Sequence, residues 1–206
     1  MKTNLEDIMS MVDLMSAEID GFIRVQYHPT EPFRILNYTE KAVFAKHWTD
    51  VTLQCRGLIV DDDNNVIARP YNKFFNHGEC ENVLSLMSEV EVTDKADGSL
   101  GIGYHTPEGY AVATRGSFTS EQALHATALF RERYARSAFV GAVITPLFEI
   151  VYPKNRIVLD YHGMDDLILL GGRDIQHGWL YGPREMARMM EWSGPVTEVF
   201  HYQTLG

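Results

Sequence analysis

Long apolar runs are missing from this sequence of 206 residues, and none approaches the roughly 18 residues that a membrane-spanning helix needs. The first residues, MKTNLEDIMSMVDLM, are too acidic for a secretory signal. Cysteine is scarce, since Cys55 and Cys80 are the only two. Two cysteines are too few for a disulfide framework, and reduced thiols are favoured over a structural disulfide. These absences predict a cytoplasmic protein.

Positive charge is also in deficit. The chain has 18 Lys and Arg against 28 Asp and Glu, for a formal net charge of −10. Proteins that coat nucleic acid by bulk electrostatics usually show a basic surplus, so any phosphate chemistry here must be local. Only six of the basic residues are lysines: Lys2, Lys41, Lys46, Lys73, Lys95 and Lys154.

Several familiar catalytic patterns are absent. The H-x-E of His77 to Cys80 resembles that of zinc deaminases, but no later cysteine pair completes a zinc site. The glycines of GSLGIG lack the P-loop lysine, and no G-x-S-x-G elbow occurs. The Asp61 to Asp63 cluster lacks the glycine and late glutamate of a calcium loop, so it predicts a solvated turn. Metal ligands therefore stay unassigned at this point.

The elements that are present predict an α+β fold with mostly antiparallel strands and packed helices. No repeat, low-complexity tract or linker divides the chain, so we expect one continuous domain over residues 1–206. Periodicity favours helices over residues 5–20, over 119–138 with Thr119 as the cap, and after Pro183. The expected strands flank the Asp61 turn, form a hairpin at 99–114, and cover 147–153, 156–161 and 166–173.

Lys95 raises the sharpest chemical question. In EVTDKADGSLGIGY it lies between Asp94 and Asp97, in the break between two alternating runs. An amine attacks phosphorus only when neutral, so such a lysine must be desolvated or near other cations, and a strand end inside a cleft would desolvate it. Gly98 would let the backbone approach a phosphate or ribose, and Asp97 or Asp94 could orient the amine or a metal. Alone, K-x-D-G is a weak signal, and a surface lysine in a turn competes with it.

Four sequence blocks change that balance. They are CRGLIV with ARPYNKFFNHGE, then KADGSL, then RGSFTSEQAL, then LFEIVYPKNRIVLDY. Their order and content resemble the covalent nucleotidyltransferase superfamily, and within it the ATP-dependent RNA ligases of the T4 RNA ligase 1-like group. Together the blocks cover most of residues 36–172. The resemblance implies an adenylyltransferase domain that uses ATP and Mg²⁺ and acts on RNA ends, a 5′-phosphate and a 3′-hydroxyl.

The resemblance also implies a role for individual residues. Lys95 would be the nucleophile that carries AMP, and Glu149 would meet the ribose or a hydrated metal. Arg115 stands where relatives carry lysine, so its charge is kept but its geometry differs. The residues expected to bind the nucleotide are Tyr38, Arg56, Lys73, Phe75, Gly98, Arg115 and Glu149, with Tyr38 and Phe75 the weaker matches.

Structural interpretations compete with these roles. Arg56 could pair with the acidic turn, Lys73 could be a solvated strand residue, and Phe74 and Phe75 could be core. Glu149, between Phe148 and Ile150 on an expected buried strand, would be costly there without a partner, which favours a site role. In-line phosphoryl transfer needs two or three cations around a triphosphate, and Arg56, Lys73 and Arg115 could supply them.

The sequence departs from the family in one respect. Relatives carry an E-G-x-V block and then a K-x-K block, and neither occurs here. A K-x-K pair after Lys95 is impossible, because Lys154 is the only later lysine. We therefore expect the N-terminal portion of an adenylyltransferase domain, which seals RNA poorly unless Arg173 or Arg184 replaces the missing lysines. A nucleotide- or RNA-end-binding module without turnover is the alternative, as is a DNA ligase or capping-type nucleotidyltransferase, although K-F-F-N favours RNA.

Overall fold

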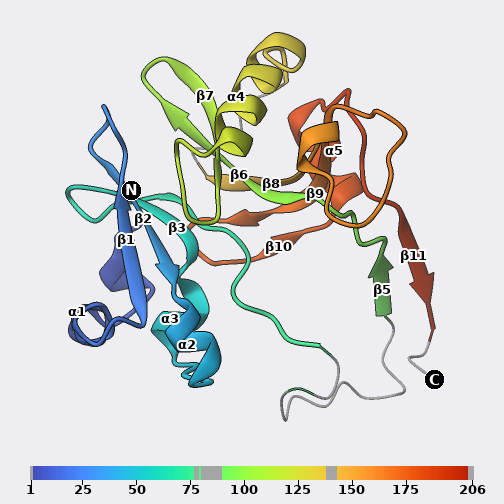
Figure 1. Ribbon diagram of the computed structural model, residues 1–206. Helices are drawn as coiled ribbons and strands as arrows, with labels where there is room; N and C mark the ends of the chain where they lie inside the picture. Colours follow the sequence, from blue (N-terminus) through green and yellow to red (C-terminus); the bar gives the residue numbers. More distant parts are fainter. Residues whose placement is uncertain (1, 77–78, 80–89, 138–142, 204–206) are drawn as a thin grey trace.

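The structure is a computed structural model that describes residues 2–76, 79, 90–137 and 143–203 (Figure 1). The helical elements in chain order are η1 Leu5–Asp7, α1 Met11–Ile19, α2 Glu40–Phe44, α3 Asp50–Gln54, α4 Glu121–Arg133, η2 Pro153–Asn155 and α5 Pro183–Met190. The strands are β1 Ile23–Tyr27, β2 Phe33–Tyr38, β3 Arg56–Asp61, β4 Val66–Ala68, β5 Val90–Thr93, β6 Ser99–Thr106, β7 Gly109–Thr114, β8 Ile144–Val151, β9 Asp166–Asp174, β10 Leu180–Tyr181 and β11 Val199–Tyr202.

The first sheet is antiparallel, with strand order β1-β2-β3-β4. The predicted turn between β3 and β4 is present, because Asp61 Oδ1 accepts hydrogen bonds from the backbone N–H groups of Asp63 at 3.0 Å and Asn65 at 2.7 Å. One face of the sheet packs on α1 and the following helices through a buried cluster that includes Leu14, Leu36, Leu58 and Val60.

The second sheet has strand order β10-β9-β8-β6-β7 and contains the predicted β6–β7 hairpin. Helices α4 and α5 pack on it, with a core that includes Phe130, Phe148, Met186 and Trp192 (Figure 1). The two sheets meet through a third cluster, in which Ile35 and Ile59 of the first sheet pack with Ile102 and Leu147 of the second. This seam between the sheets positions the candidate site.

A third, two-stranded sheet pairs β5 with β11, two strands far apart in the sequence (Figure 1). Thr93 pairs with Val199, and the Asp94 N–H donates to the Glu198 carbonyl at 3.0 Å. The Thr197 hydroxyl donates to the Asp94 carbonyl at 2.9 Å. The chain just before Lys95 is therefore fixed by the segment around residue 198. Helices on antiparallel sheets confirm the α+β prediction.

Three local predictions were wrong. The expected helix over residues 5–20 is a 3-10 turn followed by α1, because Asn4 and Ser10 each cap a separate start. Ser120, and not Thr119, caps α4. Residues 156–161 form no strand, although Ile157 and Val158 are β-branched.

Two smaller observations complete the fold. No helix in the described ranges combines the length and apolarity needed to cross a membrane. Cys55 is buried with a free thiol, and burial raises the pKa of that thiol well above its usual range. Cys80 lies outside the described residues, as do His77 and most of the segment that carries the H-x-E pattern.

Candidate active site

A β-bulge directs Arg56 toward the seam between the sheets. Leu36 pairs with Leu58 and Asn37 with Arg56, so Gly57 is the extra residue. Gly57 has a φ of 93°, in the region that favours glycine. A Cβ there would lie 2.4 Å from the Ile102 side chain and 3.1 Å from the Arg115 Cα. The R-G pair of the sequence block thus lets β3 contact β6 and the end of β7 closely.

Aromatic rings and cations gather beside this bulge. The rings of Tyr38 and Trp48 meet edge to face at 5.3 Å, and those of Trp48 and Phe75 do so at 5.6 Å. The Lys73 ammonium lies 4.1 Å from the Phe75 ring centre and 5.5 Å from that of Trp48. The Arg115 guanidinium lies 5.0 Å from the Tyr38 ring centre and donates to its hydroxyl at 3.0 Å. Cation–π contacts of this kind hold the cations in place without neutralising them.

The extended segment after β4 brings Lys73 and Phe75 to the cluster. The Lys73 N–H donates to the Leu53 carbonyl at 2.8 Å, at the end of α3. Farther back, the Arg69 N–H donates to the Thr145 hydroxyl at 2.7 Å, and Arg173 Nη1 donates to the Pro70 carbonyl at 2.8 Å. The segment is thus anchored on both sheets before it reaches the site.

Arg56 is the most constrained cation of the group. Its Nη1 is buried and bonds to no described residue, and its guanidinium lies 4.9 Å from the ring centre of the exposed Phe74. Burial lowers the pKa of Arg56, opposed by Tyr38, and the neighbouring Arg115 lowers it further. A buried donor without an acceptor is uncommon in native proteins, and an anionic or hydroxyl oxygen would satisfy it.

Lys95 lies in the connection between β5 and β6, as predicted. Its side chain is exposed, so the expectation that a cleft desolvates it is wrong for this structure. After it, the Gly98 N–H donates to Glu149 Oε1 at 2.8 Å. A Cβ on Gly98 would lie 2.3 Å from the Ile150 carbonyl oxygen, so only glycine permits this approach to β8.

Glu149 joins the lysine loop to the arginine cluster. Burial raises the pKa of Glu149 above its usual value, while the Gly98 N–H and the charges of Lys95 and Arg56 act in the opposite direction. Both cations are thus close enough to influence this carboxyl. These contacts extend the site from Lys95 through Glu149 to Arg56.

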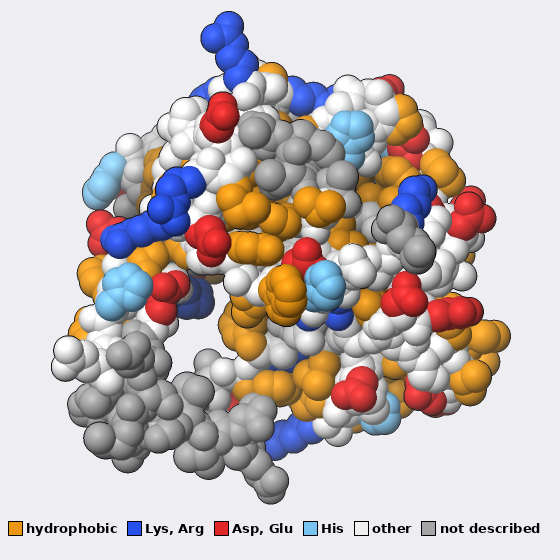
Figure 2. Space-filling model, turned by 180° about the vertical axis from the view of Figure 1, so that it is seen from behind, with side chains coloured by type: hydrophobic (Ala, Val, Ile, Leu, Met, Phe, Trp, Pro, Cys, Tyr) orange, Lys and Arg blue, Asp and Glu red, His pale blue; other side chains and the backbone are white. Residues whose placement is uncertain are grey.

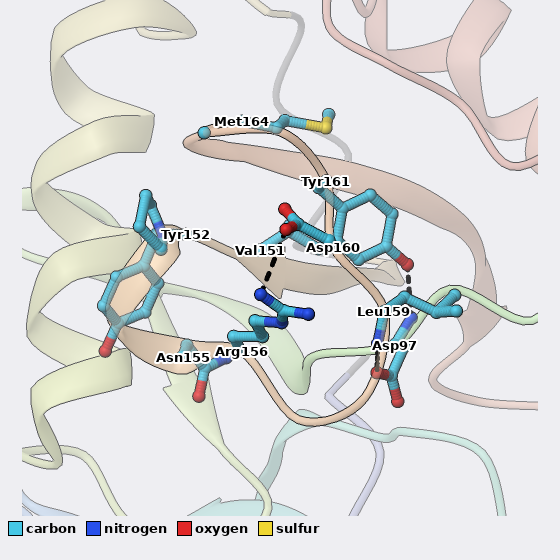
Figure 3. A pocket seen from close by; sticks show the side chains of 11 residues that line it. Asp97, Val151, Tyr152, Asn155, Arg156, Leu159, Asp160, Tyr161 and Met164 are labelled. Atoms are coloured by element: carbon cyan, nitrogen blue, oxygen red, sulfur yellow. Dashed lines mark hydrogen bonds and ion pairs between the residues drawn. The ribbon is translucent and has the colours of Figure 1, made fainter.

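Asp97 has a different role from the one expected. Its Oδ2 accepts hydrogen bonds from the N–H groups of Val158 at 2.7 Å and Leu159 at 2.8 Å. Its own N–H donates to the Tyr161 hydroxyl at 2.7 Å (Figure 3). These N–H bonds hold the pKa of Asp97 below its usual value. The carboxylate therefore tethers the loop over residues 156–161 to the lysine loop. The two loops share a cavity of about 130 Å³, smaller than the roughly 300 Å³ expected of a ligand pocket.

The charge distribution fits a local phosphate site. On the face in Figure 2, Lys and Arg side chains are scattered among acidic ones and form no basic stripe. Within the described ranges, no group of three or more His, Cys, Asp or Glu is placed to hold a metal ion. Mg²⁺ is commonly held by one or two carboxylates together with substrate phosphates, and Glu149 can supply one carboxylate in that mode.

All eight residues singled out from the sequence fall in this region. Tyr38, Arg56, Lys73, Phe75 and Arg115 form the cation and aromatic cluster, and Lys95, Gly98 and Glu149 form the neighbouring part. Sequence reasoning missed Trp48, whose ring lies between Tyr38 and Phe75, because no motif marks it.

A comparison with known families matches most of the chain. Residues 54–205 match a family model described as RNA ligase, of the T4 RNA ligase 1 type. The matched range includes seven of the eight candidate residues, and Tyr38 lies before it.

Proposed function

Because the chain belongs to the RNA ligase family, in its T4 RNA ligase 1-like group, we propose that it is an ATP-dependent RNA ligase that carries AMP on Lys95. The observation that carries the proposal is the convergence of Lys95 and Glu149 with Arg56, whose Nη1 is buried without a described partner, and with its neighbouring cations. Residues 1–206 would be the N-terminal portion of a nucleotidyltransferase-type adenylyltransferase domain.

In the first step, the neutral Lys95 Nζ forms a bond to the α-phosphorus of ATP. The bond from that phosphorus to the bridging oxygen breaks, pyrophosphate leaves with the electron pair, and the amine releases a proton to solvent. Arg56, Lys73 and Arg115 would bind the triphosphate and neutralise charge that shifts to the leaving group. Mg²⁺, when bound with the nucleotide, supplies further charge neutralisation.

The later steps return Lys95 to its starting state. An oxygen of an RNA 5′-phosphate attacks the phosphorus, the N–P bond breaks, and Nζ takes up a proton. An RNA 3′-hydroxyl then attacks that 5′-phosphate, AMP leaves, and the hydroxyl proton is released. In both steps Glu149 would orient the nucleotide through a ribose hydroxyl or a hydrated metal.

Intact mass measurement tests the proposal. The protein is incubated with Mg²⁺ and either ATP or GTP, and we expect an added nucleoside monophosphate with ATP and little with GTP. Equal labelling by GTP would favour a capping-type enzyme. Absence of any adduct at saturating ATP would contradict the proposal.

A second candidate rests on the missing K-x-K block and the exposed Lys95. It is a module that binds nucleotide or RNA ends without turnover. Such a module would bind ATP in a calorimetric titration and give no adduct, which distinguishes it from the ligase.

A further inference from the structure

Asn37 carries a buried polar atom that the proposed chemistry leaves unexplained. Its Oδ1 has no hydrogen-bond partner among the described residues. Most buried polar side-chain atoms in native structures are paired, and leaving one unpaired costs about 1–3 kcal/mol. Asn37 of β2 pairs with Arg56 of β3, directly after the bulge at Gly57.

The unpaired oxygen has a counterpart on the next strand. Asn37 and Arg56 are direct partners in the β2–β3 register, so their side chains leave the same face of the sheet. Arg56 Nη1 is likewise buried and unpaired in the described part of the chain, and it is a donor. Neighbouring positions thus present one free acceptor and one free donor that do not bond to each other.

The unpaired acceptor of Asn37 and the unpaired donor of Arg56 together restrict which chemical group of a ligand can bind beside them. A phosphate oxygen accepts from Arg56 but has no proton to donate to Asn37. A hydroxyl both accepts and donates, so it satisfies both atoms. The proposed substrate brings hydroxyls of one kind to this place, those of the nucleotide ribose.

We infer that Asn37 is a further nucleotide-binding residue, whose side-chain oxygen accepts a hydrogen bond from a ribose hydroxyl. The same hydroxyl accepts from Arg56 Nη1, which leaves the other N–H groups of Arg56 for the triphosphate. The inference rests on the proposed function, which supplies the nucleotide. It assigns the recognition of the sugar to the bulge between β2 and β3.

Substitution combined with altered nucleotides tests the contact. Equilibrium binding of ATP, 2′-deoxy-ATP and 3′-deoxy-ATP is measured by titration calorimetry for the wild type and Asn37→Ala. We expect Asn37→Ala to weaken ATP binding about 10-fold, the size of one hydrogen bond to a buried group. For the analogue that lacks the contacted hydroxyl, the same substitution should change affinity less than 2-fold or so.

The variant Asn37→Asp distinguishes a hydroxyl partner of residue 37 from a phosphate partner. Aspartate keeps the acceptor, so with a hydroxyl partner it should bind ATP better than Asn37→Ala does. With a phosphate partner, the added negative charge would make Asn37→Asp the weaker of the two, and the inference would be overturned. Gln26→Ala, which removes an amide side chain from β1 of the same sheet, is the matched control and should leave affinity unchanged.

The outcomes distinguish failure of the proposed ligase function from failure of the Asn37 contact. A wild type that binds ATP without forming an adduct contradicts the proposed ligase, while the Asn37 contact is still measured by binding. Adduct formation together with equal loss for ATP and both deoxy analogues, or no loss at all, overturns the Asn37 contact alone. A wild type that binds no nucleotide overturns both. Thermal melting of each variant identifies any that fails to fold, and Asn37→Asp then provides the comparison.

Discussion

Glu149 carries a charge that its surroundings oppose. Burial favours its protonated form in the folded protein, and the Gly98 N–H together with nearby cations only partly opposes this. A carboxyl with a raised pKa contributes stability at pH values below its ordinary range and loses it as pH rises through the raised value. At neutral pH the ionised Glu149 therefore costs stability, which is typical of functional sites.

Glu149→Gln should separate stability from activity. Glutamine keeps an oxygen for the Gly98 N–H but never ionises, so the variant should be more stable than wild type at neutral pH. The difference should shrink as pH falls through the raised pKa of Glu149 and be gone below about 4. Adduct formation should slow about 10²-fold, as for other losses of a preorganised group. Denaturant unfolding across pH and adduct rates measure both effects. Exposed Glu132→Gln is the control, and a Glu149→Gln variant with full activity and no pH-dependent gain contradicts the assignment.

The sequence blocks predicted single residues that the structure brings close together. Lys95, Arg56 and Lys73 were each identified by spacing within a motif, and the structure places them in one region. Trp48 was missed because its place depends on a fold contact between the α2–α3 connection and Phe75. The exposure of Lys95 was also beyond reach, because alternation along a strand says nothing about what covers the loop that follows.

Among the elements, the bulge between β2 and β3 does most to shape the site. It requires Gly57 both for its positive φ and for close packing against Ile102 and Arg115. Alanine there meets backbone strain of about 1–2 kcal/mol together with overpacking of about 1–3 kcal/mol.

Gly57→Ala should therefore destabilise the protein by more than about 2 kcal/mol and reduce adduct yield, because Arg56 is displaced. Gly109→Ala is the matched control, since Gly109 has a φ of 114° but nothing within 4 Å of the added Cβ. It carries backbone strain alone and should be the milder change. Chemical denaturation compares the two, and equal losses would show that packing at the bulge is unimportant.

Element prediction failed where long-range contacts decide the outcome. Residues 156–161 include the apolar run Ile157 to Leu159, which favours a strand, but the Asp97 carboxylate binds two of their N–H groups and holds them as a loop. The pairing of β5 with β11 joins segments about a hundred residues apart, which no local pattern indicates. The hairpin at β6–β7 was found because its strands and turn are contiguous.

At the scale of the whole molecule, the question is whether this chain completes ligation. The two arginines considered as replacements for K-x-K are engaged elsewhere in the described structure. Arg173 is buried and donates to the carbonyls of Pro70 and Gly178, and Arg184 donates to the Val199 carbonyl at 3.3 Å. Cations for the α-phosphate must then come from Arg56, Lys73 and Arg115.

We therefore expect residues 1–206 to form the lysine adduct slowly and to seal RNA poorly. Loss of one preorganised hydrogen-bond donor typically lowers the rate about 10²–10³-fold. The effects of losing two donors that act together are not additive. A ligation assay on a 5′-phosphorylated RNA strand compares this chain with one fused to a segment that supplies E-G-x-V and K-x-K. Multiple-turnover sealing by the unfused chain would show that those blocks are dispensable here.

The most direct test of the central claim is peptide mapping of the adduct after incubation with ATP and Mg²⁺. The account predicts AMP on Lys95, loss of the adduct in Lys95→Ala, and an unchanged adduct in Lys154→Ala, which removes the exposed lysine of η2. Mapping of AMP to Lys73 or Lys154, or an adduct that persists in Lys95→Ala, would contradict it.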